Sequence, residues 1–250
     1  MAQAIITESY TLPSLGKVYD TEVNPHITLR AMTTAEEMKR LSPSDRSFKN
    51  LAEIMNDCLV DKPGIDAYDL CTGDFQFLLH KMRIVTYGTS YNMINTCPYC
   101  GYNYKSVINL EDFPILEYSE DLNKFFEIDL PKSNRHVKLR MQTPRMLDDV
   151  AIKAKELRKK APNFPGDPAF LFTLTSMISE IDGKKPDPIK LEDFIKSAHM
   201  ADTNILLETA EILAGKIGID TTINTTCNVC GEDFMSSFRF TQEFFRPTNY

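Results

Sequence analysis

The stretches that decide the fold of this chain are Cys97-Pro98-Tyr99-Cys100-Gly101 and Cys227-Asn228-Val229-Cys230-Gly231. Each follows the pattern C-x-x-C-G-x-x-aromatic, because Tyr104 and Phe234 stand three residues after the two glycines. These two motifs, here called the first and second knuckle, contain four of the six cysteines of the 250-residue chain. The repeat predicts that two distant parts of the chain meet at one site.

The chemistry of the knuckles favours a metal ion. A C-x-x-C turn holds two sulfur atoms on the same side of a tight loop, and the following glycine can adopt the positive φ that turns backbone N–H groups toward the thiolates. Two such turns supply four soft thiolates in a tetrahedron, which suits zinc. We therefore predict that Cys97, Cys100, Cys227 and Cys230 bind one zinc ion. Its role would be structural, because four protein ligands leave no open coordination position.

The cysteine pattern has three alternative interpretations. The turns could be unrelated and hold buried reduced thiols, one pair could be a redox pair, or the thiols could form disulfides. A thioredoxin-type redox pair opens a helix after a strand, whereas strand-like segments flank both knuckles. Disulfides suit small secreted domains, and the N-terminal MAQAIITESY lacks the basic region and apolar core of a secretory signal. Cys58 and Cys71 are expected to be buried core residues rather than ligands.

Composition and charge narrow the classes of partner. With 42% hydrophobic and 25% charged residues, the chain has ordinary soluble composition, and no stretch approaches the ~18 apolar residues of a membrane helix. The formal net charge is −7, and four thiolates with one zinc ion would add two negative charges. Such a field repels nucleic acid, which zinc ribbons bind through basic surfaces. The densest basic cluster, Lys153 to Lys160, is expected to be a solvated helix face.

The hydrophobic pattern predicts an α+β fold that is mainly helical, with the split four-cysteine zinc ribbon and short antiparallel β-hairpins. Helices are predicted at about 48–60, 74–86, 144–160, 168–181, 191–199 and 203–217, after a short helix that ends before Ser42-Pro43. Strands are predicted at about 26–32, 91–95, 104–110, 125–130, 137–141 and 220–226, with an alternating stretch from 234 to 240. The helix starts are a capping box at Thr34-Ala35-Glu36-Glu37 and the cap-and-proline pairs Thr143-Pro144 and Asp167-Pro168.

These elements divide the chain into four predicted parts. They are an extended N-terminal segment (1–32), an N-terminal helical region (33–89), the split zinc ribbon and tail (90–110 plus 219–250) and an inserted hairpin and helical region (111–218). The 126 residues between Cys100 and Cys227 far exceed the ~15–20 of an ordinary ribbon. Zinc would therefore close a long loop, and its binding energy would appear as folding stability. The tail Phe244-Phe245-Arg246-Pro247 is predicted either to dock on a partner or to pack on its own domain.

The motifs of common catalytic chemistries are absent from the sequence. It has no phosphate-binding loop, dinucleotide glycine fingerprint, G-x-S-x-G or H-E-x-x-H. The histidines are scattered, and His80 is expected to be a hydrogen-bonded helix histidine rather than a ligand. The acidic pair Asp148-Asp149 is expected to be solvated at a helix start. We therefore predict no enzymatic activity and no catalytic residue.

The order of these signals along nearly the full chain resembles the T-even-type baseplate hub assembly family of contractile-tailed phages. The stretches that carry the likeness are LPSLGKVY at 12–19, ITLRAMTTAEE at 27–37, CPYCG at 97–101, CNVCGEDF at 227–234 and FFRP at 244–247. The resemblance implies a non-enzymatic protein that helps to build the baseplate hub or forms part of it.

The resemblance also implies partners and a location. The partners would be phage tail and baseplate proteins, met in the bacterial host cytoplasm during assembly or in the virion tail baseplate. The chain would act either as an assembly chaperone that leaves the finished particle or as a structural baseplate subunit. The alternatives are a zinc-ribbon nucleic-acid-binding regulator, which the acidic charge disfavours, and an unrecognised enzyme.

Overall fold

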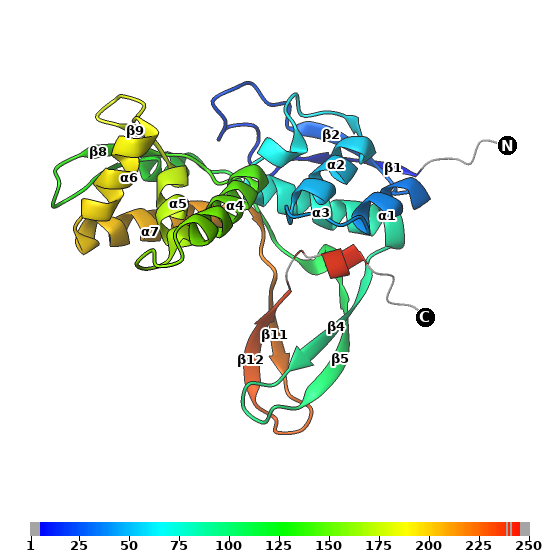
Figure 1. Cartoon of the computed structure of the whole chain (residues 1–250). Helices are drawn as coiled ribbons and strands as arrows, with labels where there is room; N and C mark the ends of the chain where they lie inside the picture. The colour runs from blue at the N-terminus through cyan, green and yellow to red at the C-terminus, as the bar shows by residue number, and fades with distance from the viewer. Residues whose placement is uncertain (1–5, 239, 241, 246–250) are drawn as a thin grey trace.

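Two helical lobes and a projecting pair of β-hairpins make up the computed structural model of this chain (Figure 1). The structure describes residues 6–238, 240 and 242–245. It confirms the predicted α+β class and the short antiparallel hairpins. The helices share the described residues with twelve short strands, so the description as mainly helical stays a prediction. None of the described helices combines the length and the apolar character needed to span a lipid bilayer.

The first lobe is built on the N-terminal strands, three α-helices and one short 3₁₀ helix. Its strands form an antiparallel sheet in the order β1 (Thr7–Thr11), β2 (His26–Arg30) and β3 (Leu59–Asp61). Its helices are α1 (Thr34–Arg40), α2 (Lys49–Cys58), the short 3₁₀ helix η1 (Ala67–Asp69) and α3 (Thr72–Tyr87). Helix α3 confirms the helix predicted at about 74–86 and forms the centre of the lobe, because its apolar side chains Phe75, Leu78, Leu79 and Met82 are all buried.

The predicted four-part division of the chain stays a prediction, but the packing joins its first two parts. Leu12, Ile27 and Leu29 from the N-terminal segment lie in the same hydrophobic core as α2 and α3. The loop after β1 is held by Asp74 of α3, whose buried carboxylate accepts hydrogen bonds from the Ser14 backbone N–H at 2.9 Å and the Tyr19 hydroxyl at 2.6 Å. The N-terminal segment is therefore part of the first lobe.

The second lobe contains the predicted hairpin and the remaining helices. Its antiparallel sheet has the order β7 (Glu127–Asp129), β8 (His136–Leu139) and β9 (Ile178–Ile181), with η3 (Glu120–Phe125) beside it. Its helices are α4 (Pro144–Lys160), α5 (Pro168–Met177), α6 (Pro188–Ser197) and α7 (Met200–Gly215). The starts of α4 and α5 are confirmed, because Thr143 and Asp167 cap them and proline follows each cap.

The structure corrects the predicted end of one helix, α5, and the predicted start of another, α1. The helix predicted at 168–181 ends at Met177, and Ile178–Ile181 forms β9 beside β8. The branched Ile178 is buried in this sheet, where its side chain packs better than in a helix. The capping box of α1 lies one residue before the predicted one, with Thr33 as cap and Glu36 as its partner. Arg30 of β2 forms an ion pair with Glu36 at 2.7 Å and lowers the pKa of this carboxyl to about 2. The ion pair holds Glu36 in place as the partner of Thr33 in the capping box.

The chain enters and leaves the second lobe at one point, where β6 (Ile115–Leu116) pairs antiparallel with β10 (Gly218–Ile219). The short 3₁₀ helix η2 (Leu110–Asp112) precedes this crossing. An added Cβ on Gly73 at the start of α3 would lie 2.3 Å from the Ile217 carbonyl oxygen. Only glycine therefore lets α3 approach the returning chain so closely.

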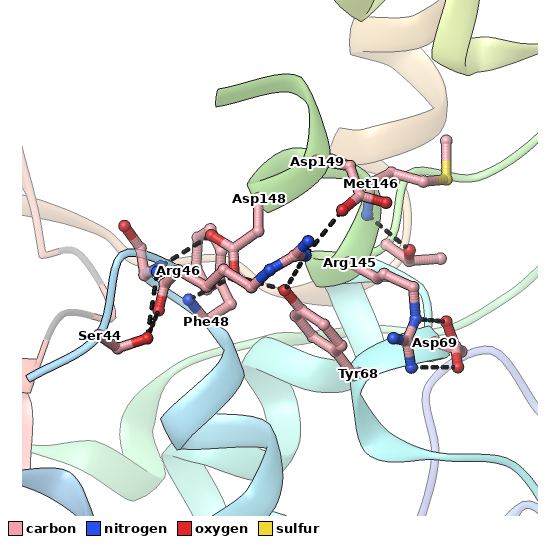
Figure 2. A network of polar contacts seen from close by, with 11 residues as sticks. Ser44, Arg46, Phe48, Tyr68, Asp69, Arg145, Met146, Asp148 and Asp149 are labelled. Carbon is pink, nitrogen blue, oxygen red and sulfur yellow. Dashed lines mark hydrogen bonds and ion pairs between the residues drawn. The ribbon is translucent and has the colours of Figure 1, made fainter. Parts of the chain in front are cut away.

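A polar network joins the two lobes at the N-terminal end of α4 (Figure 2). Asp148 is 3% exposed and accepts hydrogen bonds from the Ser47 N–H at 2.8 Å, the Phe48 N–H at 2.9 Å and the Tyr68 hydroxyl at 2.7 Å. The expectation that Asp148 is solvated is wrong. Phe48 stands at the N-cap of α2 and makes no side-chain capping hydrogen bond. The carboxylate of Asp148 reaches from the other lobe and holds the backbone N–H groups of Ser47 and Phe48, directly before the helix.

Two ion pairs flank Asp148 in Figure 2. Arg46 pairs with Asp149 at 2.7 Å. Arg145 binds both carboxylate oxygens of Asp69, at 2.6 and 2.9 Å, while its guanidinium lies 4.4 Å from the Tyr68 ring centroid. The bidentate geometry and the stacked ring fix the orientation of α4 relative to η1.

The described part of the aromatic tail packs on its own domain. Phe244 and Phe245, in η4 (Gln242–Phe245), are buried in the core of the first lobe. The buried Arg83 of α3 donates a hydrogen bond from Nε to the Phe244 carbonyl oxygen at 3.2 Å. Arg246 and Pro247, the rest of the predicted docking segment, lie outside the described residues.

His80 lies under this tail without the hydrogen bonds expected of it. Its ring is 1% exposed and makes edge contacts with Phe113 and Phe240, and within the described structure neither ring nitrogen has a hydrogen-bond partner. Burial lowers the pKa of His80 to about 4, and the charge of Lys81 adds to this effect. His80 is therefore neutral in the folded protein at neutral pH.

The protonation of His80 is expected to destabilise the protein in acid. Its unfolded pKa is about 6.5, so between pH 6.5 and pH 4 the unfolded chain binds a proton that the folded chain does not. The contribution of neutral His80 to the free energy of unfolding is fully present above pH 6.5. It decreases as the pH is lowered, and about 3 kcal/mol of it is lost at pH 4. Urea unfolding at pH 7 and pH 4 should show this loss reduced in His80→Leu and unchanged in the exposed control His26→Gln. An equal loss in all three proteins would contradict the assignment.

Candidate metal centre

Two β-hairpins stack face to face to form the projecting ribbon (Figure 1). The first pairs β4 (Ser90–Thr96) with β5 (Asn103–Asn109), and the second pairs β11 (Thr222–Thr226) with β12 (Asp233–Ser237). Burial alternates along β5, β11 and β12 and along β4 from Met93 onward, so each hairpin has an inner and an outer face. The ribbon predicted from the two knuckles therefore forms from segments far apart in the sequence.

The knuckles at the ends of these hairpins have the same backbone. The N–H of Gly101 donates to the Cys97 carbonyl, and the N–H of Gly231 donates to the Cys227 carbonyl, both at 2.9 Å. The two glycines have φ of +71° and +76°, which side chains other than glycine rarely adopt. The repeat in the sequence is thus a repeat of local structure. Each knuckle directs its two sulfur atoms toward the other knuckle.

The four predicted ligands come together at this end of the ribbon. The sulfur atoms of Cys97 and Cys230 lie 3.6 Å apart, as do those of Cys100 and Cys227, and all four lie within 4.8 Å of one another. A tetrahedron with Zn–S bonds of ~2.3 Å has S···S edges of about 3.8 Å, whereas a disulfide bond measures ~2.05 Å. The spacing fits a four-thiolate zinc site and excludes disulfides between these cysteines in this structure.

The electrostatics of the cluster require a cation if all four thiols are to ionise. The backbone N–H groups of Cys230 and Val229 lower the pKa of Cys227 to about 6. For Cys230, the Glu232 backbone favours the thiolate, but desolvation and the adjacent cysteine sulfurs outweigh it and raise the pKa to about 12. The pKa of Cys100 is also raised. A zinc ion would supply the positive charge that these neighbouring thiolates need.

The other two cysteines lie elsewhere, as expected. Cys58 and Cys71 are fully buried in the first and second hydrophobic cores. Burial raises the pKa of Cys58 to about 12 and raises that of Cys71 as well. Both are therefore protonated core residues and take no part in the candidate metal centre.

The sequence did not reveal the polar contacts that join the two hairpins. The Tyr104 hydroxyl and the Thr225 hydroxyl lie 2.7 Å apart, and the buried Asn95 accepts a hydrogen bond from Ser236 at 3.1 Å and donates one to Ser106 at 2.7 Å. The only signal for these contacts was the alternation of the strands. Because this inner face is small and partly polar, apolar burial alone stabilises the ribbon weakly.

Comparison with known proteins identifies the family. The family model for the T4 bacteriophage base plate protein matches residues 4–246, which is nearly the whole chain. No curated protein and no solved structure matches the chain. The match covers both knuckles, both lobes and the described tail, and it agrees with the likeness of the sequence motifs. The chain therefore belongs to the T4 bacteriophage base plate protein family.

Proposed function

We propose that this protein assembles the hub of a phage baseplate through protein–protein contacts, with zinc as a structural ion. The observation that carries the proposal is the family match over residues 4–246. A baseplate is built by contacts between its proteins, so the partners are other baseplate proteins of the same phage. The proposal includes no enzymatic step.

The outer faces of the ribbon support a role in protein contacts. Ile94 and Val107 on the first hairpin are 68% and 71% exposed, and Met235 on the second is 75% exposed. Their positions in the registers of the hairpins place them on the outer faces, away from the polar contacts that join the hairpins. Exposed apolar side chains on a projecting element are suited to contacts with another protein.

The same faces do not favour the alternative of a nucleic-acid-binding regulator. Among the outward positions of the four described strands, Lys105 is the single cation and Asp233 the single anion. A nucleic-acid-binding ribbon needs several lysines or arginines to neutralise phosphates. Together with the net charge of −7, this favours protein partners.

Affinity purification of the tagged chain from infected cells is expected to recover baseplate proteins identifiable by mass spectrometry. An unrelated phage protein with the same tag provides the control. Mass spectrometry of purified virions then assigns the finer role, because a chaperone is absent from the particle and a structural subunit is present in fixed copy number. Recovery of no baseplate protein, or a salt-sensitive mobility shift of DNA or RNA, would argue against the proposal.

A further inference from the structure

The second lobe contains a cavity of 270 Å³ between α4, α5, β9 and α6. Its lining combines apolar and polar side chains, and the apolar part includes Val150 from α4, Phe172 from α5 and Leu191 from α6. Ligand pockets for drug-sized molecules measure about 300–1,000 Å³, so this cavity is small for such a ligand. It has room for one or two apolar side chains of a protein partner. We call it the second-lobe pocket.

Three cations surround the apolar lining, and none is neutralised by a carboxylate in the described structure. They are Arg140, Lys153 and Lys185. Arg140 uses Nη2 to bind the Ile178 carbonyl oxygen at 2.7 Å, which leaves its charge uncompensated. All three residues are exposed, so their side chains can meet a ligand at the mouth of the pocket.

The two acidic residues of the pocket are already engaged. Asp149 pairs with Arg46 at 2.7 Å in the network between the lobes, and Glu192 pairs with Lys196 at 3.3 Å one turn along α6. The pocket therefore has a local excess of positive charge in a chain whose net charge is −7. Such a site attracts a negatively charged group that the rest of the surface repels.

We propose that the second-lobe pocket binds an acidic, apolar-anchored peptide segment of a partner protein. One apolar side chain of that segment fills the cavity between α5 and α6, and flanking carboxylates contact Arg140, Lys153 and Lys185. The apolar lining distinguishes this ligand from a nucleic-acid backbone, which has no side chain to place there. The inference rests on the proposed function only in taking a baseplate protein as the source of the segment.

Photo-cross-linking from inside the pocket tests the proposal directly. Phe172 is replaced by the analogue p-benzoyl-phenylalanine in the full-length chain, infected cells are irradiated, and the cross-linked peptide is sequenced by mass spectrometry. We expect a peptide from a baseplate protein that has several carboxylates beside an apolar residue. No cross-linked peptide, a peptide without acidic residues, or cross-linked nucleic acid would overturn the proposal.

A matched pair of charge reversals supplies the control. Lys153→Glu with Lys185→Glu removes two pocket cations, and Lys159→Glu with Lys190→Glu makes the same charge change on exposed residues outside the pocket lining. We expect the first pair to reduce the cross-linking yield about tenfold and the second to leave it within about twofold. Circular dichroism checks that all variants stay folded. Equal yields for the two pairs would overturn the proposal.

The outcomes also separate this inference from the proposed function. If the unmodified chain recovers baseplate proteins but Phe172 cross-links to none of them, the pocket assignment fails and the assembly function stands. If the unmodified chain recovers no baseplate protein, the assembly function fails first. The two results are compared in parallel cultures infected with the same phage.

Discussion

Replacement of Cys227 by serine is expected to abolish zinc binding and to unfold the projecting ribbon. Structural zinc sites contribute on the order of 10 kcal/mol to folding at neutral pH, and isolated two-stranded hairpins are marginally stable at best. The inner face of this ribbon includes the polar residues Asn95, Ser106 and Ser236. Without the metal, little else keeps the two hairpins together.

The zinc prediction is measured by elemental analysis and limited proteolysis. Protein purified without chelator should contain about one zinc per chain, and Cys227→Ser or Cys97→Ser should contain less than about 0.1. The matched control is Cys58→Ala, which removes a buried thiol of the first lobe and should keep the zinc. Absence of zinc from the unmodified protein would refute the metal centre.

The damage from zinc loss is expected to spread to the tail but not to the second lobe. Phe244 packs on Tyr91 of β4 and on Phe238, with ring centroids 5.3 and 5.5 Å apart. The second lobe has a separate hydrophobic core that includes Leu174 and Leu206 but no residue of the ribbon. Protease cleavage in the Cys227→Ser protein should therefore begin at the hairpins and the tail, while α4 to α7 stay protected.

The features that sequence analysis predicted correctly depend on neighbouring residues. The two knuckles are recognisable because ligand spacing, glycine and aromatic residue all lie within eight positions. The starts of α4 and α5 are recognisable because a capping side chain and a proline stand next to each other. In each case the physical cause lies within one turn of the chain.

The features that sequence analysis missed depend on residues that are far apart in the sequence. Ile178 extends the apolar pattern of α5, and its pairing with Leu139 of β8 decides that it belongs to a strand. Asp148 looks like a solvated helix start until the backbone N–H groups of residues 47 and 48 reach it. The second-lobe pocket likewise needs the packing of three helices and a strand before its apolar lining exists.

Asp148→Ala is expected to lower the free energy of unfolding by about 4 kcal/mol. The substitution removes the acceptor of three hydrogen bonds from Ser47, Phe48 and Tyr68, and hydrogen bonds to charged groups contribute about 1.5–3 kcal/mol each with incomplete additivity. It leaves the backbone N–H groups of Ser47 and Phe48, directly before α2, without the acceptor that holds them in the folded protein.

Asp149→Ala is the matched control for Asp148→Ala, because it removes a neighbouring carboxylate of the same helix. Asp149 is half-buried and pairs only with the Arg46 side chain among the contacts of Figure 2, so its loss should cost far less. Urea unfolding at neutral pH in the presence of zinc measures both effects on the folded chain. Equal destabilisation by the two variants would show that the hydrogen bonds of Asp148 do not stabilise the segment that leads into α2. A large effect of Asp148→Ala alone would establish that the first lobe depends on the second for the start of one of its helices.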